Sequence, residues 1–333
     1  HMDALRQIYG YKTFTGRGAR DFRVWLFREA EEARSNEDLA RRFVVRCRET
    51  QTILPAISTI ERMCADALVA AERRIETRIA RRIDGELRSR MTALLTETMP
   101  GNISRLVWLR KFEVGNNSAT ANRLLDRLEF LQGLKLPNAI LKGVPVHRVT
   151  RLKRQGERYF TDGLRDIGSD RRIAILACCC VEWEAAIADA VVETHDRIVG
   201  KTWREAKQLH ETRIGDARSA VTATLRGFTA IGTAMITARN DGVPVETVLG
   251  RIPEWDQLDQ LVATAARLSS TMADEPLVHV GMGYHRFRRY VPRMLRCLRI
   301  ECAPVAKPLL AAAMKIRDNR PPDAADSDFL RPS

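Results

Sequence analysis

One apolar stripe constrains the fold of this 333-residue chain more than any other feature. Between residues 170 and 199, apolar side chains recur at alternating steps of three and four residues. The stripe consists of Ile173, Leu176, Cys180, Trp183, Ile187 and Val191. Because this spacing keeps them on one side of an α-helix, it is typical of a helix that packs lengthwise in a bundle. We predict a long central helix from about Asp170 to Val199, followed by a second long helix through Arg239.

The remainder of the chain also repeats with helical spacing. A further long helix is predicted over residues 61–83, where one face turns from apolar to strongly basic along the segment. The sequence shows no internal repeat and no series of strands. The predicted fold class is therefore all-α, a multi-domain helical protein with a long central helix.

Turn-forming and proline-rich segments divide the chain into four predicted parts. The segment MPGN ends the first part, DGVP breaks the helix near the end of the second, and PPDAADSD marks the last. The parts are an N-terminal helical domain at 3–100, a central helical domain with the long helix at 101–250, a third helical region at 251–318, and a linker at 319–333.

The charge of the chain indicates a polyanionic partner. The formal net charge is +13, and arginine is far more common than lysine. The planar guanidinium of arginine suits phosphate oxygens and guanine edges. A merely soluble basic surface is the alternative, but so large an excess of positive charge favours nucleic acid.

The cysteines indicate a reducing compartment. None of the seven forms a CxxC pair, and Cys178, Cys179 and Cys180 are consecutive. On a helix such neighbours point about 100° apart, so they cannot converge on one metal ion. We predict buried, reduced cysteines in a cytoplasmic protein, with no metal site. The apolar run from Ile173 to Val181 is too short to span a bilayer, so no membrane contact is predicted.

The segment from Pro145 to Ile167 has the outline of a helix-turn-helix. Val146, Val149 and Leu152 share one face of the first predicted helix, and arginines repeat at the same spacing on the opposite, solvated face. Gly156 can close this helix in the left-handed conformation, and a second short helix follows from about Thr161.

Basic residues in and around this segment are the candidate DNA contacts. The candidates are Arg148, Arg151, Lys153, Arg154, Arg158, Arg165, Arg171, Arg172, Lys201, Arg204 and Lys207. A second basic patch over residues 73–82 contains Arg73, Arg74, Arg78, Arg81 and Arg82. For this second patch the alternative is a solvated face balanced by Glu72, Glu76 and Asp84.

No catalytic arrangement is complete in the sequence. Gly200-Lys201-Thr202 is similar to the end of a phosphate-binding loop, but His195 stands where the first glycine should be. His195-Asp196 lacks a second histidine cluster, and His210-Glu211 lacks the partner histidine of a zinc protease motif. We therefore predict no catalytic residue and no cofactor in this chain.

Several segments resemble transposases of the Tn-three family, the large enzymes that move replicative bacterial transposons. The matching segments occur in the family's order along nearly the whole chain. They are GYKTF, RDFRVWL, ILPAISTIERMCADAL, LVWLR, RLLDRLEFLQGLKLP, HRVTRLKRQG, LRDI, RRIAIL, HDRIVGKTWREAK, RRYVPRML and FLRP. Each segment alone is unspecific, but their collinear order makes the resemblance specific.

The resemblance implies that this region grips the transposon's terminal inverted repeats and helps to bring two subunits together. Residues 3–100 and 101–250 would then bind DNA, 251–318 would support dimerisation or assembly, and 319–333 would lead to a catalytic domain. That domain, with an RNase H-like fold, three carboxylates and divalent metal, is expected after Phe329-Leu330-Arg331-Pro332. We expect this chain to be a fragment that cannot itself cut DNA, working in the bacterial cytoplasm at the nucleoid.

The family's functional residues carry over to named positions. Its basic segment with a closing glycine matches Arg148, Arg151, Arg154 and Gly156; its Leu-Arg-Asp matches residues 164–166; and its arginine pair matches Arg171 and Arg172. The chain departs from the family at His147, where asparagine is usual, and at Thr150, where an apolar residue is usual.

Two other functions remain open on the sequence. The chain could be chiefly a helical assembly module, in which the long helix and the region from about Gly250 mediate dimerisation and the arginines pair with acids. It could also be a stand-alone repressor, which would require the chain to be a whole gene product.

Overall fold

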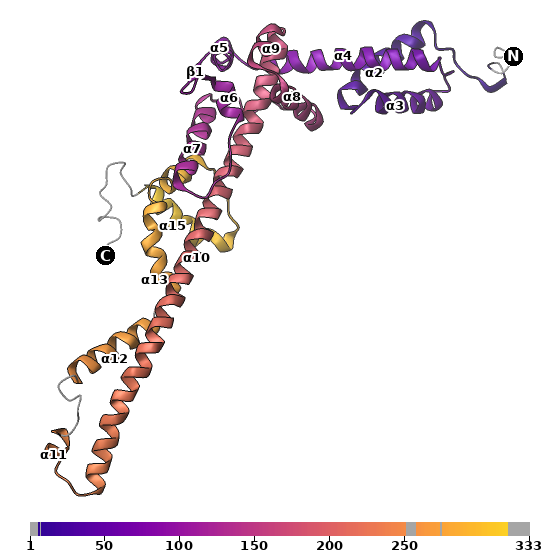
Figure 1. Cartoon of the computed structure of the whole chain (residues 1–333). Coiled ribbons are helices and arrows are strands. Elements are labelled where there is room, and N and C mark those ends of the chain that lie inside the picture. The colour runs from indigo at the N-terminus through magenta and orange to yellow at the C-terminus, as the bar shows by residue number, and fades with distance from the viewer. Residues whose placement is uncertain (1–5, 7, 251–257, 274, 319–333) are drawn as a thin grey trace. The chain divides into compact units, whose positions relative to one another are not determined.

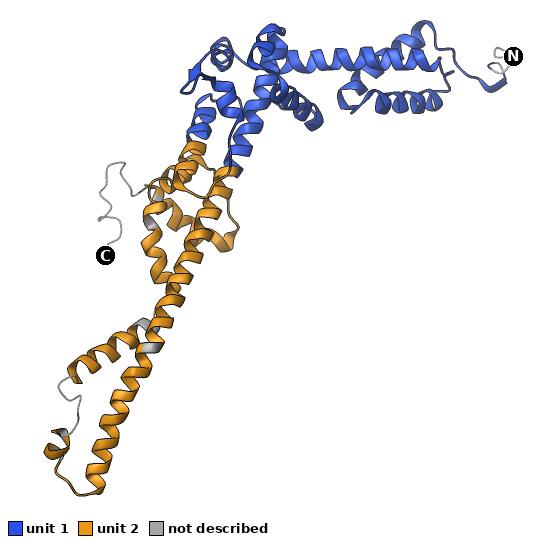
Figure 2. Ribbon diagram, in the orientation of Figure 1, with its two compact units in different colours: residues 1–113, 126–189 blue, residues 114–125, 190–333 orange. Residues whose placement is uncertain are grey.

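The structure is a computed structural model, and it describes residues 6, 8–250, 258–273 and 275–318 (Figure 1). Within these residues nearly all elements are helices, so the all-α prediction is confirmed. The chain forms two compact units (Figure 2): unit 1 comprises residues 1–113 and 126–189, and unit 2 comprises residues 114–125 and 190–333. The predicted division at residues 100 and 250 stays a prediction, and the predicted linker at 319–333 lies outside the described residues.

Unit 1 begins with three packed helices: α2 (Gly16–Glu32), α3 (Asn36–Glu49) and α4 (Ile57–Arg81). Their shared core places phenylalanines from α2 and α3 against small side chains of α4, among them Ala67 and Ala71. The rings of Phe14, Phe22 and Phe43 lie with centroids 5.2–5.6 Å apart. Small residues on α4 let the helices approach closely, so this bundle is well packed without large side chains on every helix.

Short elements follow α4 in unit 1. They are α5 (Gly85–Ala93), strands β1 (Thr98–Met99) and β2 (Ile103–Ser104), and α6 (Arg105–Arg110). The strands pair as an antiparallel hairpin whose turn contains Gly101 and Asn102, both with positive φ. The MPGN segment is therefore a hairpin turn inside unit 1. The next helix is α7 (Ser118–Gly133), of which residues 118–125 belong to unit 2 and the remainder to unit 1.

The helix-turn-helix outline is present as α8 (Val146–Arg158) and α9 (Thr161–Asp166), but the predicted turn is misplaced. Gly156 does not close α8; it is a buried residue within the helix. A Cβ at this position would lie 2.4 Å from Cys179 Sγ and 2.8 Å from Ile175 Cγ2. Glycine is required because α8 and α10 touch here, and the turn falls at residues 159–160 instead. Val146 is also not packed as predicted, since it is 80% exposed.

The predicted pair of long helices is a single helix, α10 (Ser169–Asn240). The prediction placed a break near Val199, but Gly200 continues the helix, since one glycine lowers helix stability without ending it. The stripe from Ile173 to Val191 is buried as predicted, and so are the three consecutive cysteines. These three cysteines are free thiols.

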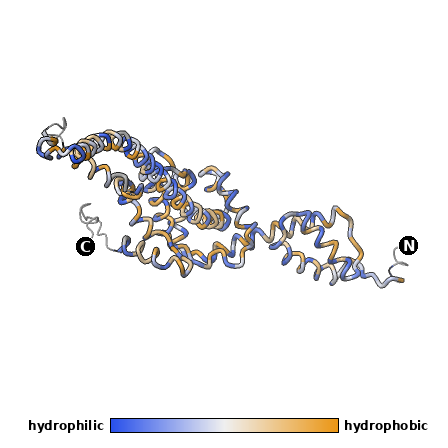
Figure 3. The backbone as a smooth tube through the Cα atoms, turned by 90° about the horizontal axis from the view of Figure 1, so that it is seen from below, coloured by the Kyte–Doolittle hydropathy of each residue, from blue (hydrophilic) through white to orange (hydrophobic). Residues whose placement is uncertain are grey.

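Unit 2 contains the second part of α10 and a series of shorter helices, some of which contact α10. The shorter helices are α11 (Val245–Leu249), α12 (Leu258–Ala273), α13 (Pro276–Val280), η2 (Gly281–Arg286), α14 (Val291–Cys297), η3 (Pro304–Ala306) and α15 (Lys307–Asp318). The hydroxyl of buried Tyr290 lies 2.9 Å from His195 Nδ1. Hydrophobic and hydrophilic residues are interleaved along the helices of the chain, as expected where one side of a helix packs (Figure 3).

Among the described residues, no helix is both long and apolar enough to cross a membrane.

The contact between α8 and α10 predicts that Gly156→Ala destabilises unit 1. A methyl group at this position meets a sulfur atom and a methyl carbon of α10, so overpacking of roughly 1–3 kcal/mol outweighs the better helix propensity of alanine. Thermal unfolding followed by circular dichroism measures the effect. Gly168→Ala is the matched control, because a Cβ at Gly168 would meet nothing within 4 Å. Equal melting temperatures for the two variants would contradict this packing.

Candidate nucleic-acid interface

A basic groove lies on unit 1 where α8 faces the turn between α2 and α3. Its volume is about 680 Å³, and its lining residues come from α8 and from the turn between α2 and α3. The lining residues are Arg34, His147, Arg148, Thr150, Arg151, Arg154, Gln155 and Arg158. Five of these eight side chains are arginines, so the groove concentrates positive charge in one concave surface.

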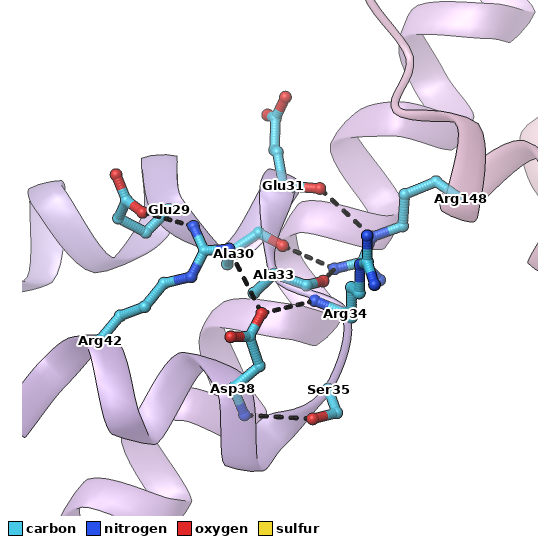
Figure 4. A network of polar contacts seen from close by, with 9 residues as sticks. All are labelled: Glu29, Ala30, Glu31, Ala33, Arg34, Ser35, Asp38, Arg42 and Arg148. Atoms are coloured by element: carbon cyan, nitrogen blue, oxygen red, sulfur yellow. Dashed lines mark hydrogen bonds and ion pairs between the residues drawn. The ribbon is translucent and has the colours of Figure 1, made fainter.

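The prediction that Arg148 lies on a solvated face is wrong, because this side chain lies at the bottom of the groove. Its side chain is 3% exposed. As Figure 4 shows, it reaches from α8 to the end of α2, where Nη2 donates to the carbonyl oxygens of Ala30 at 2.6 Å and Ala33 at 3.0 Å. Nε donates to the Glu31 carbonyl at 3.4 Å. The last carbonyls of a helix have no partner within the helix, so Arg148 caps α2 and holds α8 against it.

The turn that presents Arg34 is fixed by a polar network (Figure 4). Ser35 Oγ accepts a hydrogen bond from the backbone N–H of Asp38, which is the N-cap arrangement of α3. The Arg34 backbone N–H donates to Asp38 Oδ2 at 3.0 Å, and this bond lowers the pKa of Asp38. Arg42 links the same carboxylate to Glu29. With its backbone held, Arg34 places an exposed side chain at the groove.

Sequence reasoning missed Arg34. Its position directly before the N-cap serine is a visible signal for a helix start, but nothing in the sequence pairs it with α8. The two segments are more than 110 residues apart, and Arg148 brings them together.

The exposed arginines of α8 differ in how they are paired. Arg151 is half exposed, and its Nη1 lies 2.7 Å from Glu72 Oε1. Arg154 and Arg158 are exposed, and within the described residues neither forms an ion pair or a side-chain hydrogen bond. The Arg34 side chain is likewise unpaired among these residues. Three guanidinium groups at the groove are therefore available to an anion.

Two other predicted residues of this region behave differently. Lys153 does not line the groove; its Nζ lies 3.7 Å from Glu157 on the neighbouring turn. His147 does line it, but burial and the adjacent Arg148 lower its pKa, so the imidazole is neutral at pH 7. His147 therefore adds a polar ring and no charge to the groove.

The second basic patch is divided. Arg78 donates two hydrogen bonds to the Glu31 carboxylate at 2.8 and 3.0 Å, and Arg74 lies 3.6 Å from the same group. Arg82 donates to the carbonyls of Ile140 and Lys142. These contacts connect α4 to neighbouring segments. The acid that pairs with Arg74 and Arg78 is Glu31 of α2, and not Glu72, Glu76 or Asp84, which the sequence suggested. The residues that face solvent without an ion pair, among those described, are Arg73 and Arg81.

The arginines around α9 also make structural contacts. Arg165 donates to the Leu95 carbonyl and pairs with Asp162 at 3.0 Å. Arg172 donates to the Arg165 carbonyl at 2.9 Å. Arg171 Nε lies 3.7 Å from Glu76 Oε1. Their predicted role in DNA binding stays a prediction.

The remaining predicted residues lie on the part of α10 that belongs to unit 2. Lys201, Arg204 and Lys207 are all exposed, and Lys207 Nζ lies 3.8 Å from Glu211. Across the described ranges, no group of three or more histidine, cysteine, aspartate or glutamate side chains is arranged to hold a metal ion.

A groove lined by five arginines has the charge that suits an anion. A family described as "Domain of unknown function (DUF4158)" matches residues 1–67. The chain is 29% identical over 338 residues to the transposase for transposon Tn21 from Escherichia coli, covering all of this chain and 34% of that protein. It is also 29% identical over 342 residues to the transposase for transposon Tn501 from Pseudomonas aeruginosa, with the same two coverages.

A more distant relative extends the same pattern. The transposase for transposon Tn1546 from Enterococcus faecium is 25% identical over 338 residues, which is 99% of this chain and 34% of the relative. The resemblance to transposases of the Tn-three family is therefore confirmed along the whole chain. The chain spans about a third of the length of these relatives.

The cap on α2 predicts that Arg148→Ala destabilises unit 1 by roughly 3 kcal/mol, because it leaves buried carbonyl groups without donors. The variant Arg148→Lys should recover only part of this loss, since an ammonium cannot reproduce the planar fork. Urea denaturation measures both. The control Arg154→Ala should stay within about 0.5 kcal/mol of the unchanged protein. A stability loss in Arg154→Ala as large as in Arg148→Ala would refute the cap.

Buried Glu76 predicts a pH-dependent stability difference. Burial raises the pKa of this carboxyl above its ordinary value of 4.5, although Arg171 opposes the shift. The folded state therefore holds the proton more tightly than the unfolded state, so the stability linked to this proton is fully present below pH 4.5 and is lost as the pH rises through the folded pKa. Relative to Glu76→Gln, the unchanged protein should lose stability in urea titrations as the pH rises above 4.5. A difference that moves the other way would contradict the shift.

Proposed function

We propose that this chain is a DNA-binding region of a transposase and that the groove of unit 1 holds the duplex of a transposon's terminal inverted repeat. One observation carries the proposal: Arg34, Arg154 and Arg158 gather around a single groove, and no carboxylate of the described residues pairs with them. The whole-length similarity to transposases supports DNA as the polyanion and a transposon end as its source.

The three unpaired arginines would neutralise backbone phosphates and set the register of the protein on the duplex. Arg151 would contribute less, because Glu72 already neutralises it. Arg148 acts as a positioning residue, since it places α8 and the Arg34 turn on opposite walls of the groove.

Between the arginines, Thr150 and Gln155 offer uncharged polar groups to base edges. Gln155 Oε1 already accepts a hydrogen bond from Arg171 Nη2 at 3.3 Å, so its amide N–H groups are what it can offer to a base edge. The Thr150 hydroxyl donates to the Val146 carbonyl, so Thr150 can accept a hydrogen bond or contact a thymine methyl group. These two side chains are the candidates for sequence reading. His147 stands beside them as a neutral ring.

On α4 of unit 1, Arg73 and Arg81 are exposed basic residues that suit additional phosphates. On unit 2, Lys201 and Arg204 of α10 offer the same chemistry by themselves. We further propose that the active form is a homodimer that brings two transposon ends together, and that strand cutting and joining are carried out by other parts of a full-length transposase.

A helical assembly module is the second candidate, and exposed apolar side chains favour it. Leu225 and Ile236 on α10, and Val262 on α12, are more than half exposed. Such side chains suit contacts with another protein. Light scattering without DNA separates the two functions: a tight dimer with negligible affinity for any duplex would favour assembly.

The proposed groove predicts that the double variant Arg154→Ala/Arg158→Ala binds DNA more weakly. The test duplex is one recovered by selection from a random library, and affinity is measured by fluorescence anisotropy at several salt concentrations. The slope of log affinity against log salt should fall by about 0.9 for each phosphate that is no longer neutralised, or roughly two in total. Arg226→Ala, which removes an exposed arginine of unit 2, should leave the slope unchanged. An unchanged affinity and slope in the double variant would refute the groove as the site.

A further inference from the structure

The turn between α8 and α9 presents a bare aromatic ring. Phe160 is 86% exposed, more than Tyr9 at 63% or Trp203 at 45%. An exposed phenylalanine of this kind gains nothing from folding, because its apolar surface stays in contact with water. A single exposed apolar residue needs no explanation by itself, so the role of this ring depends on how it is held and what surrounds it.

The backbone on both sides of Phe160 is anchored. Arg110 Nη2 donates to the carbonyl oxygens of Gly156 at 2.6 Å and Tyr159 at 3.1 Å. On the other side, the hydroxyl groups of Thr161 and Ser104 lie 3.2 Å apart. The turn is thus held by Arg110 of α6 and by Ser104, the residue that precedes α6. A partner that contacts the ring does not have to order the backbone first.

The chemistry around the ring favours a nucleic acid over an apolar protein surface. Arg158, two residues before Phe160, lines the groove and is unpaired among the described residues. Two neighbouring acids lie near basic side chains of their own helices: Asp162 pairs with Arg165 at 3.0 Å, and Glu157 lies 3.7 Å from Lys153 Nζ. An exposed aromatic ring two residues from an unpaired guanidinium suits a ligand that has anionic phosphates next to flat aromatic faces, which is the arrangement of a base step.

We propose that Phe160 is an intercalating wedge: its ring inserts at a base step of the duplex held in the groove, partly unstacks that step and bends the DNA. The inference rests on the proposed function and adds a specific role to it. Wedges of this type select for steps that deform easily, because the unstacking energy depends on the sequence. Phe160 would then contribute to sequence preference without bonding to a base edge.

The experiment compares Phe160→Ala, Phe160→Trp and the unchanged protein on the selected duplex. Affinity is measured by anisotropy, and bending by energy transfer between dyes at the two ends of the duplex. Phe160→Ala should bind roughly 5- to 100-fold more weakly and bend the duplex less, with the same salt slope, because the ring no longer stacks while the arginines still neutralise phosphates. Phe160→Trp should restore affinity and bending. Val146→Ala, which truncates an exposed apolar residue at the other end of α8, should change neither.

The outcomes separate this inference from the proposed function. If the unchanged protein does not bind duplex DNA, both fail. If it binds and bends DNA but Phe160→Ala behaves in the same way, the wedge is wrong while the groove stands. If Phe160→Ala instead abolishes self-association in light scattering without altering bending, the ring is a protein contact and the wedge is overturned. Unfolding of Phe160→Ala should match the unchanged protein, since the ring packs against little.

Discussion

The guanidinium of Arg148 supports the arrangement of unit 1. It bonds to three carbonyl groups at the C-terminal end of α2 and lies near Glu72 of α4, so one side chain connects α8 to both helices. Burial lowers its pKa, yet arginine remains charged in proteins, so the buried cation must be held by these acceptors. The groove exists because this contact sets the Arg34 turn opposite the exposed face of α8.

The same principle recurs through unit 1, where several other arginines serve the fold. Arg78, Arg82, Arg110, Arg165 and Arg172 all donate to backbone carbonyls of other segments. A planar group with five donors can close several helix ends and loops at once, which a chain rich in short helices needs. The net charge of +13 therefore overstates the charge offered to a partner, and the unpaired arginines of the groove are the informative part.

The sequence predicted the elements better than their contacts. The buried stripe on α10 and the all-α class follow from periodicity, which the chain carries locally. The break near Val199 was wrong because a glycine does not by itself end a helix. The prediction that Gly156 ends α8 was wrong. Glycine suits both a helix end and a close contact between helices, and here it serves the contact with Cys179. Arg148 and Arg154 both belong to the predicted basic repeat of α8, and nothing in that repeat shows that the end of α2 covers the first and leaves the second exposed.

Mass spectrometry of arginine modification tests the central claim most directly. The protein is treated with an arginine-selective dicarbonyl reagent with and without the selected duplex, and the extent of modification is compared at each residue. Arg34, Arg154 and Arg158 should react in the free protein and be protected by DNA, while Arg226 should react equally in both and buried Arg148 in neither. Equal reactivity of Arg34, Arg154 and Arg158 with and without bound duplex would contradict the groove as the DNA site.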